Sequence, residues 1–183
     1  MTAGLANGGK GAVALVILLT LAVLGWRLSA RETRVAVHRP FDAHPKLFVE
    51  EASCPAEGNA FANGRRTEEL ARLRTDRYAY DPRDGVRAVR RYLEAESCYR
   101  AAGDDVGVHR ARRAGAALAA RVNTDYAAAR LNLLNALERE RWSVALTEIR
   151  RLLLLTDHIG RHEYVEWLSE IIGRVTVKAR TAP

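Results

Sequence analysis

The sequence predicts an all-α protein: an N-terminal transmembrane helix, then a linker, then a bundle of antiparallel helical hairpins. Three observations support this prediction. The run at 11–26 is apolar and uncharged, prolines and glycines interrupt residues 31–64, and apolar residues then recur at the i, i+3, i+4, i+7 spacing of amphipathic helices. The expected divisions are a tail (1–10), an anchor (11–28), a linker (29–64), a short helix (65–79) and a helical domain (80–179).

The apolar run at 11–26 reads GAVALVILLTLAVLGW and predicts a membrane-spanning helix about 24 Å long. Lys10 and Arg27 bound the run and can extend to the lipid headgroups, while Trp26 stands where interfacial aromatic residues are found. A cleaved signal peptide is the alternative, but cleavage after Ala30 would place Leu28 at the minus-three position, where a small residue is needed. We therefore expect a single-pass anchor in a bacterial inner (plasma) membrane.

Basic residues are more frequent after the anchor than before it. Four arginines follow the run: Arg27, Arg31, Arg34 and Arg39. This Lys/Arg bias favours a cytoplasmic domain, and there these arginines could contact anionic lipid at about 1 kcal/mol each. The opposite, periplasmic orientation stays open, because Lys10 alone could retain the N-terminus in the cytoplasm.

The two cysteines, Cys54 and Cys98, have neither the spacing of a metal motif nor that of a disulfide framework. For a cytoplasmic domain we expect two free thiols, with Cys98 buried and Cys54 reactive in the linker. A disulfide between them would require an oxidising compartment.

Capping residues and polar turns divide residues 80–179 into five expected helices. Asp81 is a suitable N-cap, and Pro82 suits the first helical position. Breaks are expected at Gly103, Asn123–Thr124, Glu138–Arg141 and Thr156–Gly160. The predicted helical core is Tyr92, Tyr99, Leu118, Leu133, Leu137, Trp142, Ile149, Leu152, Leu168 and Ile172.

Two stretches resemble the tetratricopeptide repeat, a pair of antiparallel helices with small and large apolar residues at fixed contacts. Ala95, Tyr99 and Ala102 have the spacing of its second helix, and residues 126–157 have about the length of one repeat. Within the latter, these residues stand where a second helix would have them: Trp142, Ala145, Ile149 and Leu152. The resemblance implies a helical-hairpin scaffold that binds other proteins. An irregular helical bundle is the alternative.

No catalytic, cofactor or metal site is predicted. His158 and His162 have a metal-ligand spacing, but Gly160 lies between them at an expected turn, which indicates two surface histidines at helix ends. Four Arg pairs suggest a basic surface: Arg65–Arg66, Arg90–Arg91, Arg112–Arg113 and Arg150–Arg151. Since glutamates accompany them, we expect mostly solvated or ion-paired helix faces, and nucleic acid is an unlikely partner.

These observations favour a membrane-anchored scaffold or assembly factor that binds a protein partner in a membrane complex. The alternative is a binder of nucleic acid or anionic lipid through exposed arginines. An enzyme is the least favoured class, because no residue pattern indicates a reaction.

Overall fold

The computed structural model describes residues 43–48 and 51–181. These residues form five α-helices and no strand, which confirms the predicted all-α class for this part of the chain. The helices are α2 (Ala60–Arg77), α3 (Pro82–Ala101), α4 (Asp105–Glu138), α5 (Trp142–Leu155) and α6 (Glu163–Thr181).

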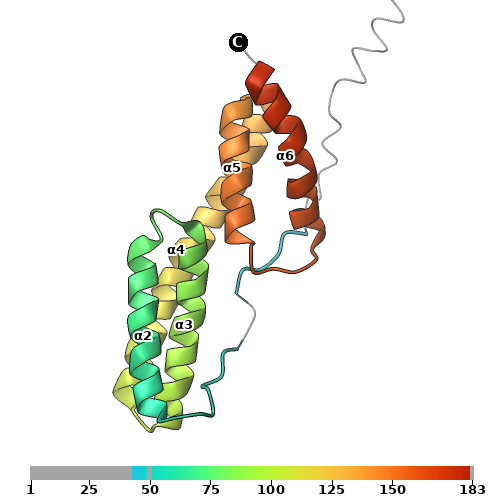
Figure 1. Cartoon of the computed structure of the whole chain (residues 1–183). Coiled ribbons are helices and arrows are strands. Elements are labelled where there is room, and N and C mark those ends of the chain that lie inside the picture. The colour runs from blue at the N-terminus through green and yellow to red at the C-terminus, as the bar shows by residue number, and fades with distance from the viewer. Residues whose placement is uncertain (1–42, 49–50, 182–183) are drawn as a thin grey trace, which may run out of the picture. The chain divides into compact units, whose positions relative to one another are not determined.

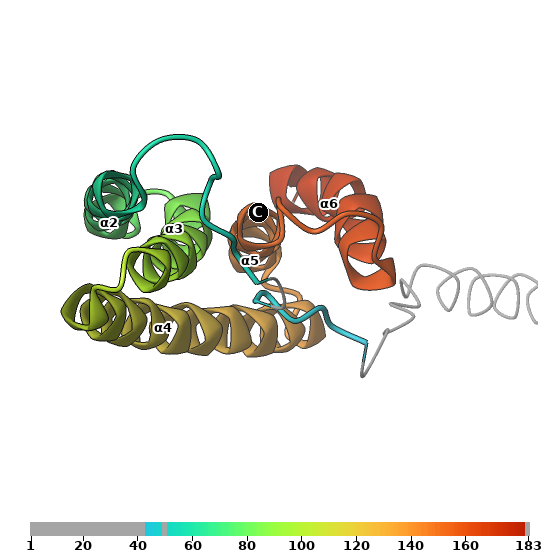
Figure 2. The same cartoon turned by 90° about the horizontal axis from the view of Figure 1, so that it is seen from below.

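The long helix α4 is the spine of the helical unit. Each helix packs against the next one in sequence. At one end of α4, α3 packs on it with α2 alongside, and at the other end α5 packs on it and α6 packs on α5 (Figures 1 and 2). Asp125 lies in the middle of α4 and joins both ends. It accepts a hydrogen bond from the Tyr78 hydroxyl at 2.6 Å and pairs with Arg151 of α5 at 3.6 Å.

Two residues at the α3–α4 turn account for the sharp reversal of the chain there. Gly103 has φ +74°, a left-handed conformation that glycine adopts without strain. Asp104 then accepts a hydrogen bond from the Gly107 amide at 3.0 Å and so caps α4. The sequence had indicated a break at Gly103.

The predicted break at Asn123–Thr124 is wrong, because α4, which is 34 residues long, continues through both residues. The Thr124 hydroxyl donates to the Ala120 carbonyl within the helix at 3.0 Å instead of capping a new one. One buried stripe runs the whole length of α4: Val108, Ala111, Gly115, Leu118, Val122, Tyr126, Ala129, Leu133 and Ala136. Its continuous burial outweighs the capping preference of the two polar residues.

Helix α2 begins earlier than predicted, inside the expected linker. The Asn59 side chain accepts a hydrogen bond from the Ala62 amide at 3.0 Å and caps the helix. Gly64 therefore lies in a helix, where it lets α3 approach closely. A Cβ atom at this position would lie 2.9 Å from Cε1 of Tyr99.

The predicted core residues divide into two groups. Seven are buried: Tyr92, Tyr99, Leu118, Leu133, Ile149, Leu152 and Leu168. Leu137, Trp142 and Ile172 are only partly buried and pack against the larger buried cluster, which contains all of the seven except Tyr99. Trp142 instead lies beneath the Lys178 ammonium group, 4.3 Å from the centre of its ring system.

Residues 43–48 and 51–59, here called the strap, pack on the helices although the sequence predicted a linker. Pro45 and Leu47 are buried, and Nε2 of His158 donates to the Leu47 carbonyl at 2.9 Å. Cys54 forms a disulfide with Cys98 of α3, with Cα atoms 4.7 Å apart. The structure therefore differs from the expectation of two free thiols, which a separation of 44 residues had favoured.

The expected anchor at 11–28 lies outside the described residues. So do its flanking residues and the proposed lipid contacts: Lys10, Trp26, Arg27, Arg31, Arg34 and Arg39. Within 43–48 and 51–181, no helix is both long and apolar enough to cross a membrane.

Candidate functional site

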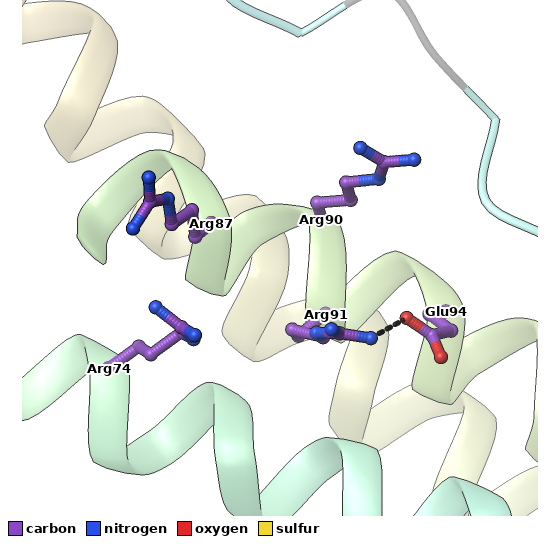
Figure 3. A pocket seen from close by; sticks show the side chains of 5 residues that line it. All are labelled: Arg74, Arg87, Arg90, Arg91 and Glu94. Carbon is purple, nitrogen blue, oxygen red and sulfur yellow. Dashed lines mark hydrogen bonds and ion pairs between the residues drawn. The ribbon is translucent and has the colours of Figure 1, made fainter. Parts of the chain in front are cut away.

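A basic pocket of about 430 Å³ lies between α2 and α3. Its lining, here called the arginine pocket, is Arg74, Arg87, Arg90, Arg91 and Glu94. Figure 3 shows Arg74 extending from α2 toward the side chains of α3. Four guanidinium groups and one carboxylate give this lining an excess of positive charge, which attracts anions.

The spacing of the α3 residues explains their convergence. Three residues follow Arg87 at distances of three, four and seven positions: Arg90, Arg91 and Glu94. This spacing places all four on one face of the helix. Arg74 joins them because α2 and α3 pack side by side. Arg74 is held by Oδ1 of the buried Asp84 at 2.6 Å.

Three arginines of the pocket, Arg74, Arg87 and Arg91, keep donors for a ligand. Each of the three forms one ion pair: Arg74 through Nη1 with Asp84 at 2.6 Å, Arg87 through Nη2 with Asp157 at 3.2 Å, and Arg91 through Nη1 with Glu94 at 2.6 Å. A guanidinium group carries five N–H donors, and each of these ion pairs uses one terminal nitrogen. These contacts orient the three side chains and leave further N–H groups for an incoming anion.

A second pocket, of about 440 Å³, adjoins the first and shares Arg87 and Arg90 with it. Three segments line it: Lys46, Leu47 and Phe48 of the strap; Val86, Arg87, Arg90 and Leu93 of α3; and residues 157–160 between α5 and α6. Because much of this lining is aliphatic or aromatic, we call it the apolar pocket. The two pockets together form a surface that is basic over one part and apolar over the other.

The strap wall of the apolar pocket is fixed at two places. His158 holds the Leu47 carbonyl, and the Cys54–Cys98 disulfide fastens the chain to α3 a few residues later. The Cys54 amide also donates to Oγ of Ser97 at 3.2 Å. The pocket is therefore built from segments that are distant in sequence and joined covalently.

A third pocket, of about 660 Å³, surrounds a buried ion-pair network at the other end of α3. The Glu68 carboxylate accepts hydrogen bonds from Tyr99 at 2.7 Å, Arg72 at 2.6 Å and Arg110 at 2.9 Å. The Arg110 hydrogen bond is the main cause that lowers the pKa of Glu68 to about 2, against the opposing effect of burial.

The charges around this third pocket balance. Its lining holds Arg65, Arg72 and Arg110 against Glu68, Glu69 and Asp104. The carboxylate of Glu68 on α2 already binds Tyr99 of α3 and Arg110 of α4, so the network connects these three helices. We assign it a role in the fold and take the arginine and apolar pockets as the candidate functional site.

The histidines and the Arg pairs that the sequence singled out lie at several separate places in the structure. His158 contacts the strap, and Nδ1 of His162 accepts a hydrogen bond from the Tyr164 amide at 3.1 Å. Among the described residues, no group of three or more His, Cys, Asp or Glu side chains could hold a metal ion. From the four Arg pairs, Arg91, Arg112 and Arg151 are ion-paired, and Arg90 and Arg91 line the arginine pocket.

Sequence reasoning missed Arg74, Arg87 and the pocket-lining strap residues 46–48. The spacing of Arg87 relative to Arg90, Arg91 and Glu94 was a detectable signal for a basic face of α3. The contribution of Arg74 and of the strap depends on tertiary packing, which the local sequence does not encode.

Comparisons of the chain with protein-family models, with curated proteins and with solved structures return no match. The chemistry of the candidate site therefore guides the assignment of function. Its lining combines fixed guanidinium groups with apolar side chains, and this arrangement suits recognition of a ligand that is anionic at one end and apolar at the other.

Proposed function

We propose that the protein is a membrane-tethered interaction module that binds a partner protein at the arginine and apolar pockets. The observation that carries this proposal is the adjacency of the two pockets, which share Arg87 and Arg90. Protein-binding sites commonly combine an apolar contact with surrounding charged groups that set orientation and specificity.

Two sequence features support the proposal. The apolar run at 11–26 predicts a membrane anchor, which would hold the helical unit at a bilayer surface. The resemblance to tetratricopeptide repeats implies a scaffold for protein binding, and every element of regular secondary structure in the described residues is a helix, as a scaffold of that kind requires.

The disulfide supports a location on the oxidising side of the membrane. Cytosolic thiols are kept reduced, so a disulfide that fixes a structural segment is expected in the periplasm or an equivalent compartment. The four arginines after the anchor favour the opposite orientation. We give the Cys54–Cys98 bond greater weight, because it fastens to α3 the strap, whose residues 46–48 line the apolar pocket.

In-cell photocrosslinking tests the proposed function. Arg90 in the full chain is replaced by a photoreactive amino acid, and Arg66, an exposed residue on α2, is replaced in the matched control. We expect a discrete protein adduct in the membrane fraction from position 90 and none of the same size from position 66. Identical adducts from the two positions, or none from position 90, would contradict binding at this site.

A further inference from the structure

The chemistry of the two pockets specifies the segment that the partner presents. Building on the proposed function, we propose that this segment is acidic and carries an apolar side chain beside its carboxylates. The carboxylates lie in the arginine pocket, and the apolar side chain enters the apolar pocket.

The arginine pocket selects carboxylate groups by charge and geometry. Four of its five lining residues are arginines, and the fork of a guanidinium group matches the two oxygens of a carboxylate. Arg74 and Arg91 already bind carboxylates of the same chain at 2.6 Å. A partner carboxylate would use the N–H groups that these contacts leave.

The apolar pocket requires more than an anion. Leu47, Phe48 and Leu93 contribute to its lining, together with Val86 and Ile159. Its volume of about 440 Å³ lies toward the small end of ligand pockets, which span roughly 300–1,000 Å³. That volume suits one large side chain, such as leucine or phenylalanine, better than the two long acyl chains of a phospholipid.

The residues shared by the two pockets determine how close the partner's carboxylates and its apolar side chain must be to each other. Arg87 and Arg90 line both pockets, so a ligand that fills one extends directly into the other. An inorganic phosphate could bind the arginines alone and would leave the apolar pocket empty. A short peptide with adjacent acidic and apolar residues satisfies both.

The test uses the full chain in nanodiscs of neutral lipid and three labelled pools of short peptides. The first pool combines aspartate and glutamate with one leucine or phenylalanine. The second replaces the apolar residue by glycine, and the third replaces the acidic residues by lysine. Fluorescence anisotropy should show binding of the first pool that is at least about tenfold tighter than that of the other two, and that weakens as salt is added.

Three variants assign the binding to the pockets. Arg87→Gln combined with Arg90→Gln should weaken binding of the first pool at least about tenfold. Leu93→Ala should weaken the first pool severalfold and leave the glycine pool unchanged. Arg65→Gln combined with Arg66→Gln is the matched control, since this exposed pair on α2 lies outside both pockets, and its affinity should equal that of the unmodified protein. Helical circular dichroism and the melting temperature verify that each variant is folded.

Several outcomes would overturn the inference. These are equal binding of the three pools, no binding of the first pool, or an unchanged affinity in the Arg87 and Arg90 variant. Competition by inorganic phosphate or by phosphatidylglycerol vesicles that matches the acidic apolar pool would assign the site to phosphate groups instead. If crosslinking from position 90 succeeds while the peptides fail, the proposed function stands with a partner of different chemistry; failure of both rejects the two together.

Discussion

The two ends of the helical unit are held together by different interactions. At the N-terminal end, formed by α2, α3 and α4 up to Leu118, buried carboxylates join the helices: Glu68 of α2 binds Arg110 of α4, and Glu96 of α3 binds Arg112 of α4. At the C-terminal end, formed by α5, α6 and α4 from Val122, large aliphatic residues fill the interfaces: Leu133, Ile149, Leu152, Leu155, Leu168 and Ile171.

This difference follows from side-chain size. Alanine and glycine on α2, α3 and the first part of α4 let these helices approach closely, as at Gly64 and Gly107, where a Cβ atom would lie within 3 Å of the Tyr99 ring. Small residues bury little apolar area each, so polar contacts with fixed geometry contribute more of the specificity there. The candidate site lies on the ion-paired α3, where arginines held by carboxylates offer a preorganised surface.

The largest expected effect is that of Tyr99→Ala. Tyr99 is fully buried and donates its hydroxyl hydrogen bond to Glu68, so its removal leaves a cavity and deprives a buried carboxylate of a donor. We expect a loss of about 3–5 kcal/mol in the free energy of unfolding, measured by urea titration in detergent. Tyr99→Phe, which retains the ring, should cost about 1–2 kcal/mol.

Leu152→Ala is the counterpart at the C-terminal end, and it should cost about 2–5 kcal/mol with little dependence on pH. If Leu152→Ala proves costly while both Tyr99 variants are neutral, the N-terminal end does not depend on its buried polar contacts.

Loss of the disulfide ranks next. Cys54→Ser opens a bridge between residues 44 apart, for which the loop-entropy relation gives about 4 kcal/mol. The free energy of unfolding should fall by about 2–4 kcal/mol, and hydrogen exchange should increase in the strap and in the α3 turn around Cys98. An unchanged unfolding curve after reduction would show that the strap contributes nothing to the fold.

Glu68→Gln should remove a pH-dependent contribution. The pKa of Glu68 is lowered from 4.5 to about 2 in the folded protein, chiefly by Arg110, so its stabilising effect is fully present above about pH 4.5. It is lost as the pH falls from 4.5 toward 2. At pH 7 we expect a cost of about 1–3 kcal/mol, reduced by the exposure of Arg72 and Arg110, and near pH 2 the two proteins should unfold alike. A difference that persists undiminished at pH 2 would contradict this assignment.

The substitutions at the Trp142–Lys178 contact have the smallest expected effects. The sequence predicted a buried core residue, whereas the structure leaves Trp142 partly exposed beneath Lys178. We expect Trp142→Ala to lower the free energy of unfolding by about 1–2 kcal/mol, instead of the ~3–5 kcal/mol typical of a buried tryptophan. Lys178→Gln, which removes only the contact of the ammonium group with the ring, should lower it by about 0.5–1 kcal/mol. A melting shift as large as that of Tyr99→Ala would show that Trp142 belongs to the core.

The sequence predicted the local features of the structure and missed those that depend on contacts between distant segments. Apolar stripes and caps indicated α3, α5 and α6, because these signals are local. They failed at Thr124, where a residue that favours caps is accommodated inside a continuous buried stripe. The strap, the disulfide and the contribution of Arg74 to the candidate site depend on contacts between distant segments, and a periodic pattern contains no information about them.

The proposed placement of the helical unit on the oxidising side of a membrane is tested most directly by the state of Cys54 and Cys98 in intact cells. Thiols are trapped by rapid alkylation before lysis, and the membrane fraction is analysed with and without reductant. We predict that both cysteines resist alkylation until reductant is added and that the protein then changes its gel mobility. Immediate alkylation of both cysteines in intact cells would contradict the disulfide and return the helical unit to the cytoplasm.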